Sequence, residues 1–246
     1  MEIISSNSNK FVKLARSLAE KKYRDQTGLF LVEGGNSVYD MPDSAMVEFF
    51  LVSERRAEEF EFKKPNRKAP CYMVTDSVMQ SLSDTVTPYG VAAVVKKPDN
   101  IFFEPGGNAL ILDGVSDSGN LGTIFRTAAA AGFNDIYLLS SADAYSPKVV
   151  RASMSAIFKV RTAVIDEDKA LYLAKGYNGV ALDMGGEDIK NLKIDKPVTL
   201  ILGSEAHGVR DSLIKAAKKT VRIDMKNNME SLNVAVAAGI AMYFIN

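Results

Sequence analysis

The stretch LDGVSDSGNLGTIFRTAAAAG, residues 112–132, holds the most informative pattern in this chain. An apolar run over residues 109–112 ends in Asp113, a polar loop with glycines follows, and a helix-forming run then carries Arg126. A loop that leads into a helix exposes backbone N–H groups, which suit an anion or a polar ligand. The pattern therefore predicts a strand, a loop and a helix with a ligand site at their junction.

Two later stretches repeat this plan of apolar strand, small or polar turn and helix. They are LILGSEAHGV, residues 200–209, and MESLNVAVAAG, residues 229–239. Around them, strands and helices alternate regularly, which predicts a mostly parallel sheet covered on both faces, with a ligand site at the carboxyl ends of the strands. The expected strands are 109–112, 135–139, 159–163, 179–182, 199–202 and 221–223, and helices are expected to begin near Asn120, Pro147, Glu167, Val209 and Ser231.

The first part of the chain also alternates between helices and strands, which predicts a small α/β/α sandwich. A helix is expected over residues 8–24, with Ser8 as its N-cap. Strands are expected over GLFLVEG, residues 28–34, and at 48–52, 69–74 and 91–95, and short helices at 36–41, 54–60 and 76–82. The segment 97–108 contains two prolines and two glycines and predicts a linker. The expected domains are therefore 1–96 and 109–246.

Composition limits the possible chemistry. The chain has 246 residues, one cysteine and one histidine. Cys71 and His207 alone cannot supply an internal disulfide, a Cys-rich or His-rich metal site or a Ser–His triad, so no metal is expected. No apolar run reaches the roughly 18 residues of a membrane helix, and no signal peptide is recognisable, so a cytoplasmic location is expected. The chemistry must depend on Arg, Asn, Ser, Glu or a bound cofactor.

Three motifs in this chain together resemble those of the SpoU, or TrmH, branch of the SPOUT RNA methyltransferases. In motif 2, an apolar strand is followed by glycine, a small polar residue, glutamate and a second glycine. Motif 3 departs from the family pattern at Asp224, Asn227 and Ala235, and motif 1 at Ser118, where proline is common. The matching positions are Asn120, Gly122, Arg126 and Thr127 in motif 1, Leu202, Gly203, Ser204, Glu205 and Gly208 in motif 2, and Ile223, Met225, Ser231, Leu232, Asn233 and Val234 in motif 3.

The resemblance implies S-adenosylmethionine as methyl donor and a ribose 2′-hydroxyl of RNA as acceptor. It also implies a trefoil knot in the C-terminal domain and a homodimer formed through the knot and the apolar last helix. The implied cofactor residues are Leu182, Asp183, Met184, Gly185, Leu202, Gly203, Ile223, Met225, Ser231 and Leu232. The implied catalytic residues are Arg126, Asn120, Glu205, Ser231 and Asn233.

The chemical role of Arg126 is open at this stage. The family's arginine is assigned as the base, but a guanidinium stays protonated with a pKa above about 12. Either its surroundings depress that pKa, or Arg126 stays charged and binds a phosphate or the developing alkoxide.

The N-terminal part resembles the L30e/L7Ae-like substrate-binding domain of many such enzymes, over residues 6–34 and 83–95. This two-domain layout is more similar to ribosomal RNA enzymes than to stand-alone tRNA enzymes, so ribosomal RNA is the expected substrate. The net charge is zero, but basic stretches beside an RNA site favour phosphate contacts. The residues expected to bind RNA are Lys10, Lys13, Arg16, Lys21, Lys22, Arg24, Lys148 and Arg151.

Three alternatives remain. The chain could be a non-catalytic RNA-binding relative of the same fold, or a methyltransferase for tRNA. It could also be a nucleotide-dependent oxidoreductase, but the GNLG tetrapeptide at residues 119–122 lacks the G-x-G-x-x-G spacing of a dinucleotide fingerprint.

Overall fold

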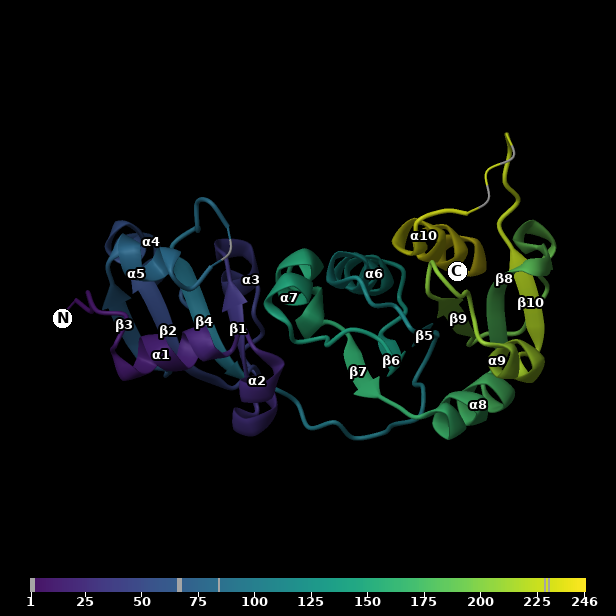
Figure 1. Ribbon diagram of the computed structural model, residues 1–246, viewed down its shortest axis with the longest axis horizontal. Coiled ribbons are helices and arrows are strands. Elements are labelled where there is room, and N and C mark those ends of the chain that lie inside the picture. Colours follow the sequence, from purple (N-terminus) through teal and green to yellow (C-terminus); the bar gives the residue numbers. More distant parts are fainter. Residues whose placement is uncertain (1–2, 66–67, 84, 228, 230) are drawn as a thin grey trace. The chain divides into compact units, whose positions relative to one another are not determined.

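A computed structural model of the chain describes residues 3–65, 68–83, 85–227, 229 and 231–246. Figure 1 shows its helices and strands. Internal contacts divide the chain into two compact units. The N-terminal unit comprises Met1–Asp99 and Tyr145–Phe158, and the C-terminal unit comprises Asn100–Ala144 and Lys159–Asn246.

The N-terminal unit contains a four-stranded sheet in the order β1-β4-β2-β3. β4 pairs antiparallel with both β1 and β2, and β2 pairs parallel with β3. The strands are β1 (Leu29–Glu33), β2 (Val47–Ser53), β3 (Cys71–Val74) and β4 (Val91–Lys96). The helices are α1 (Lys10–Ser17), α2 (Lys21–Thr27), α3 (Gly35–Tyr39), η1 (Glu54–Arg56), α4 (Ala57–Lys63), α5 (Asp76–Gln80), α7 (Pro147–Ser153) and η2 (Ala156–Phe158).

The single helix expected over residues 8–24 is wrong in two respects. The chain forms two helices, α1 and α2, and the cap of α1 is Asn9, whose side chain accepts a hydrogen bond from the Phe11 N–H at 2.9 Å. The break is stabilised by Arg24, which is 3% exposed. Its guanidinium donates to the carbonyl oxygens of Leu18 and Ala19, at 2.7 and 2.8 Å. The prediction that Arg24 binds RNA is therefore wrong, because its side chain is buried against carbonyl groups of its own unit.

The C-terminal unit contains a six-stranded sheet in the order β10-β8-β9-β5-β6-β7, in which every neighbouring pair is parallel. Figure 1 shows α6 and α10 on one face of this sheet and α8 and α9 on the other. The strands are β5 (Ala109–Asp113), β6 (Asp135–Leu139), β7 (Arg161–Val164), β8 (Gly179–Asp188), β9 (Thr199–Gly203) and β10 (Lys219–Arg222). The helices are α6 (Ser118–Ala130), α8 (Glu167–Gly176), η3 (Ile189–Asn191), α9 (Asp211–Ala216) and α10 (Val234–Ile245). The predicted parallel sheet with helices on both faces is confirmed.

The central strands of this sheet are buried on both faces, as expected of a parallel sheet between helix layers. Every residue of β5 and β6 is buried. From β5 the strand order runs through β6 and β7 to one edge, and through β9 and β8 to the other. The order in which strands are added to the sheet thus reverses at β5. A reversal of strand order leaves a crevice at the carboxyl ends of the strands, where open α/β sheets bind ligands.

The segment 100–108, part of the expected linker, packs on the C-terminal unit. The Asn100 side chain pairs with the backbone of Val164 in both directions, accepting from its N–H at 2.7 Å and donating to its carbonyl at 3.2 Å. The Gly106 N–H donates to the Asp135 carboxylate at 2.7 Å. Phe102 and Phe103 pack against the core of the unit. The side chain of Asn100 thus continues the hydrogen bonding of the edge strand β7.

The last helix differs from the sequence expectation. α10 begins at Val234 rather than near Ser231, because Asn233 caps it by accepting from the N–H groups of Ala235 and Val236. It is also less buried than an apolar sequence suggests, since Val236 and Tyr243 are 51% and 63% exposed. Among the described residues, no helix is long and apolar enough to cross a membrane.

The buried position of Arg24 predicts a structural effect of its removal. Arg24→Met leaves two carbonyl groups without a donor, and we expect the free energy of unfolding to fall by about 2–3 kcal/mol in urea titrations. The exposed Lys22→Met on the same helix is the control and should change it by less than about 0.5 kcal/mol. Loss of RNA affinity in Arg24→Met without loss of stability would show instead that Arg24 contacts RNA.

Candidate functional site

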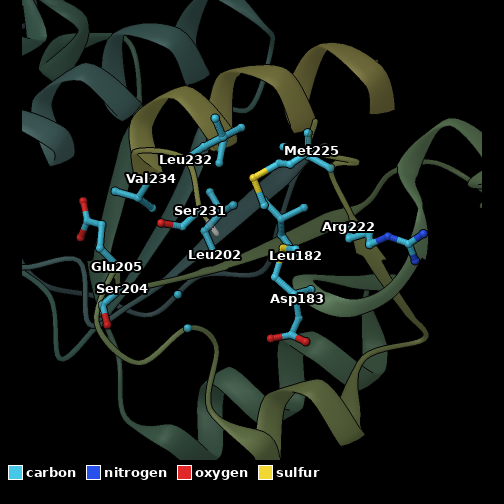
Figure 2. Close-up of a pocket in the computed structure, with 15 residues that line it drawn as sticks. Leu182, Asp183, Leu202, Ser204, Glu205, Arg222, Met225, Ser231, Leu232 and Val234 are labelled. Atoms are coloured by element: carbon cyan, nitrogen blue, oxygen red, sulfur yellow. The ribbon is translucent and has the colours of Figure 1, made fainter. Parts of the chain in front are cut away.

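A pocket lies at the carboxyl ends of β8, β9 and β10 in the C-terminal unit. Figure 2 shows Leu202, Ser231 and Leu232 close together in it, with the carboxylates of Asp183 and Glu205 at its margins. Its wall is mainly apolar with a few polar groups, which is the usual character of a small-molecule site. The lining residues are Leu182, Asp183, Met184, Leu202, Gly203, Ser204, Glu205, Gly208, Arg222, Ile223, Met225, Ser231, Leu232, Val234 and Ala237.

One wall of the pocket comes from an excursion of the chain within β8. The register against β10 passes from Ala181 opposite Thr220 directly to Glu187 opposite Val221, so residues 182–186 leave the ladder. Gly186 permits the close return, because a Cβ there would lie 2.5 Å from the Thr220 carbonyl carbon. Within the excursion, the Asp183 carboxylate accepts from the Gly185 N–H at 2.8 Å. Asp183 is thereby held at the pocket wall.

The opposite wall is the loop after β9, which closes tightly on itself. Gly208 has a φ of +65°, and its N–H donates to the Ser204 carbonyl at 2.9 Å. A Cβ on Gly203 would lie 1.9 Å from the Gly208 carbonyl carbon and 2.1 Å from the Val209 nitrogen. Only glycine fits at position 203, since the obstructing atoms are backbone. The turn carries Glu205 outward beside the pocket.

A partly buried ion pair fixes this loop to the end of β5. Arg210 contacts both carboxylate oxygens of Asp113, with the shortest distance 2.7 Å, and its own N–H donates to the same carboxylate at 3.0 Å. The hydrogen bonds with Asp113 raise the pKa of Arg210 above its ordinary value. Arg210 also donates to Glu167 at 2.9 Å, and hydrogen bonds from Ser212 and then Arg210 lower the pKa of Glu167. The loop position thus depends on contacts far apart in the sequence.

Three predicted catalytic residues form one chain of hydrogen bonds. Asn233 donates to the Asn120 side-chain oxygen at 2.9 Å, and Asn120 donates to the Glu205 carboxylate at 2.5 Å. The direction is fixed at the first residue, because the Asn233 oxygen already accepts from the N–H groups of Ala235 and Val236. Its NH₂ group must therefore face Asn120, which in turn points its own NH₂ group at Glu205. Asn233, the N-cap of α10, therefore orients the Glu205 carboxylate through Asn120.

The remaining predicted residues are distributed unevenly. Ser231 lines the pocket, as do all the predicted cofactor residues except Gly185. The side chain of Arg126 is exposed, does not line the pocket, and forms no hydrogen bond or ion pair with a residue that the structure describes. Of the residues expected to bind RNA, Arg151 contacts Glu33 in the N-terminal unit, and six others are exposed. These six are Lys10, Lys13, Arg16, Lys21, Lys22 and Lys148.

The sequence prediction missed several lining residues, of which Arg222 is chemically the most distinctive. Its guanidinium donates to the Gly186 carbonyl at 2.5 Å and to Asp224 at 3.3 Å, so it braces the β8 excursion against β10. The sequence signal that could have identified Arg222 as a lining residue is its position directly before motif 3. Val234, which is a motif 3 position, and Ala237 were also absent from the predicted cofactor residues, and both lie in α10. No group of metal-ligating side chains occurs in the part of the chain that the structure describes.

Comparisons with known proteins agree with this geometry. The SpoU rRNA methylase family model matches residues 107–243, and the MRM3-like substrate-binding domain model matches residues 9–93. The chain therefore belongs to the SpoU rRNA methylase family, and the family membership inferred from the three motifs is confirmed.

Individual relatives match over nearly the whole chain. The 23S rRNA (guanosine(2553)-2′-O)-methyltransferase RlmP of Bacillus subtilis (strain 168) is 31% identical over 100% of this chain and 99% of its own length. An AdoMet-bound rRNA methyltransferase from Sinorhizobium meliloti superimposes with a TM-score of 0.87 at 29% identity, covering 99% of this chain and 96% of that one. A putative RNA methyltransferase of the TrmH family from Porphyromonas gingivalis gives a TM-score of 0.86 at 29% identity, covering 99% and 98%. The expected SPOUT fold class is confirmed.

The tight turn at Gly203 gives a direct test of the pocket wall. Gly203→Ala forces a methyl group into the backbone of residues 208–209, and we expect it to lower the free energy of unfolding by about 1–3 kcal/mol. Gly107→Ala is the matched control, since a Cβ there meets open space at an ordinary φ. Equal stabilities of the two variants, measured by thermal and urea unfolding, would contradict the tight turn.

Proposed function

We propose that this protein transfers the methyl group of S-adenosylmethionine to a ribose 2′-hydroxyl of RNA, with ribosomal RNA as the substrate. The observation that carries the proposal is the pocket at the strand ends, where nine of the ten predicted cofactor residues, from the segment 182–184, motif 2 and motif 3, lie together. The family membership and the names of the relatives support the same activity.

The pocket suits this cofactor. Leu182, Leu202 and Leu232 offer apolar surface to a flat base, and Asp183 offers a carboxylate oxygen to hydroxyl groups. The bare backbone at Gly208 allows a ligand to approach main-chain groups closely. When bound, S-adenosylmethionine supplies an already activated methyl group, so the protein mainly has to align the acceptor oxygen with it.

The residues of the chain have distinct tasks in this proposal. Glu205, held by Asn120, presents its carboxylate at the pocket margin to orient the acceptor ribose. Arg126 stays charged and binds the phosphate beside the acceptor or the developing alkoxide, because a guanidinium is a poor base. Arg126 lies outside the pocket. It therefore comes next to the acceptor oxygen only when RNA or a second protomer is bound.

We further propose that the protein forms a homodimer with the family's trefoil knot in each C-terminal domain. The support for a dimer is the exposed apolar stripe of Val236 and Tyr243 on α10, two turns apart on one face. Residues 1–96 form the proposed RNA-selecting domain, 97–108 the linker and 109–246 the catalytic domain. We also propose a cytoplasmic location, which the match to a bacterial ribosomal RNA methyltransferase supports.

Two measurements test the activity. Calorimetric titration with S-adenosylmethionine should show micromolar binding, and NAD, the control for an oxidoreductase, should show none. Transfer of a labelled methyl group from the cofactor to unmodified ribosomal RNA should then appear as a 2′-O-methyl nucleoside and be lost in Arg126→Ala. Cofactor binding with transfer only to tRNA would favour the tRNA alternative. A folded protein without transfer to either RNA would favour a non-catalytic RNA-binding relative.

The hydrogen-bond chain from Asn233 through Asn120 to Glu205 predicts that one substitution can lower the methylation rate without lowering the stability of the protein. Asn233→Asp keeps the acceptor that caps α10 but loses the donor to Asn120, so we expect unchanged stability and a fall in kcat/KM on the order of tenfold to a hundredfold. Asn233→Ala also loses the cap and should cost about 1 kcal/mol of stability. A wild-type methylation rate in Asn233→Asp would rule out the orienting role.

A further inference from the structure

One arginine connects two segments that form the wall of the pocket in the C-terminal unit. Arg222 is the last residue of β10, and it lines the pocket itself. Its Nη1 donates to the Gly186 carbonyl at 2.5 Å, and its Nε donates to the Asp224 carboxylate at 3.3 Å. Figure 2 shows Arg222 and Met225 on one side of the pocket and Glu205 on the other. The contacts of Arg222 therefore lie away from the carboxylate that is proposed to orient the acceptor.

The first contact reaches the part of β8 that does not pair regularly with β10. The ladder passes from Ala181 directly to Glu187, so the β8 excursion, residues 182–186, stands outside its register. Gly186 ends the excursion, and Arg222 binds the carbonyl of that glycine. Because regular strand pairing does not fix the excursion, a side chain that binds its end determines where it stands. The excursion carries three predicted cofactor residues that line the pocket: Leu182, Asp183 and Met184.

The second contact restrains the chain directly after β10. Asp224 lies between Ile223 and Met225, both of which line the pocket. It is also one of the positions at which motif 3 departs from the family pattern. Since its carboxylate pairs with Arg222 two residues earlier, the ion pair bridges Ile223. The same guanidinium thus holds the β8 excursion and the start of motif 3 relative to one another.

The exposure of this ion pair favours an effect on geometry over an effect on stability. The side chains of Arg222 and Asp224 are 37% and 40% exposed. Ion pairs between side chains this exposed add little to stability, because water solvates both charges when the pair is broken. A guanidinium nevertheless has several donors in one fixed plane, so it can hold two acceptors at a defined separation. Positioning of the pocket wall is therefore the main consequence of these contacts.

We propose that Arg222 is a positioning residue for S-adenosylmethionine, which acts through Gly186 and Asp224 to hold the β8 excursion and the start of motif 3 at the spacing that the cofactor needs. The inference rests on the proposed function in taking S-adenosylmethionine as the ligand. Arg222 takes no part in the transfer itself, because it lies on the side of the pocket away from Glu205. Its loss removes binding that the ground state and the transition state share, which raises the KM for the cofactor and leaves kcat unchanged.

The first test measures cofactor affinity by calorimetric titration. In Arg222→Met the Kd for S-adenosylmethionine should rise about tenfold, as expected when a hydrogen bond from a charged group no longer holds the wall. Lys219→Met is the matched control, since Lys219 pairs with Glu187 at 3.3 Å between the same two strands but does not line the pocket. Its Kd should stay within about twofold of the wild-type value. Equal affinities of Arg222→Met and Lys219→Met would overturn the inference.

Conservative variants distinguish positioning from a general loss of structure. Arg222→Lys keeps the charge, but one ammonium lacks the planar fork that holds two acceptors, so its Kd should lie between those of the wild type and Arg222→Met. Asp224→Asn keeps an acceptor oxygen for Nε and should bind the cofactor as the wild type does. Asp224→Ala loses that acceptor and should bind more weakly. Equal Kd values for the two Asp224 variants would overturn the role of Asp224.

Hydrogen exchange follows the pocket wall without any cofactor. The Gly185 N–H donates to Asp183 within the excursion at 2.8 Å. In Arg222→Met this amide should exchange with solvent about tenfold faster or more, because local opening of the excursion then breaks one contact fewer. Amides of β5 should keep their wild-type exchange rates, and the midpoint of thermal unfolding should stay within about 2 °C. An unchanged rate at Gly185 would contradict the positioning role.

The inference and the proposed function fail in different ways. If S-adenosylmethionine binds more weakly to Arg222→Met but no RNA is methylated by the wild type, the positioning role stands and the enzymatic function falls. If RNA is methylated, and Arg222→Met lowers kcat at saturating cofactor while the KM for the cofactor is unchanged, the enzymatic function stands and the positioning role falls.

Discussion

The ion pair between Asp113 and Arg210 is the interaction on which the geometry of the candidate site depends. Asp113 ends the central strand β5, and its side chain is only 6% exposed. Arg210 follows the tight loop after β9, so the pair holds that loop against the strand end. Removing Arg210 would leave the buried Asp113 carboxylate without its charged partner, and the loss of a partner from a buried ion pair costs about 3–5 kcal/mol in measured cases. With the loop fixed, Glu205 comes within hydrogen-bond distance of Asn120 on α6.

A second constraint connects this loop to the last helix. Asn233 satisfies the first N–H groups of α10 with its oxygen, and the same amide directs its NH₂ group to Asn120. Helix capping and orientation of the candidate catalytic carboxylate thus share one side chain. Ser231 and Leu232, immediately before the cap, line the pocket. The folding of α10 and the shape of the pocket are therefore coupled through a few consecutive residues.

The two units carry two pockets of different chemistry. The pocket of the C-terminal unit is mainly apolar and bounded by closely approaching backbone, as suits a cofactor. The pocket of the N-terminal unit is lined by two charged side chains, Glu33 and Arg151, and by the apolar side chains of Met79 and Leu82. The segment Tyr145–Phe158 belongs to the N-terminal unit although it connects two strands of the C-terminal sheet. One continuous connection between β6 and β7 therefore contributes Arg151 to the pocket of the N-terminal unit.

The sequence by itself determined the type and order of most elements, because apolar periodicity, caps and turn residues act over a few positions. The resemblance to the family implied Leu182, Leu202 and Ile223 as cofactor residues, and the three line one pocket in the structure. Only the tertiary structure decided that Arg24 is buried, that Asp113 pairs with Arg210, and that Arg151 lies beside Glu33. The partners in the last two contacts are about a hundred positions apart in the chain, and local patterns carry no information about such pairings. The fold places those side chains together, and their charges and burial then determine what each can bind.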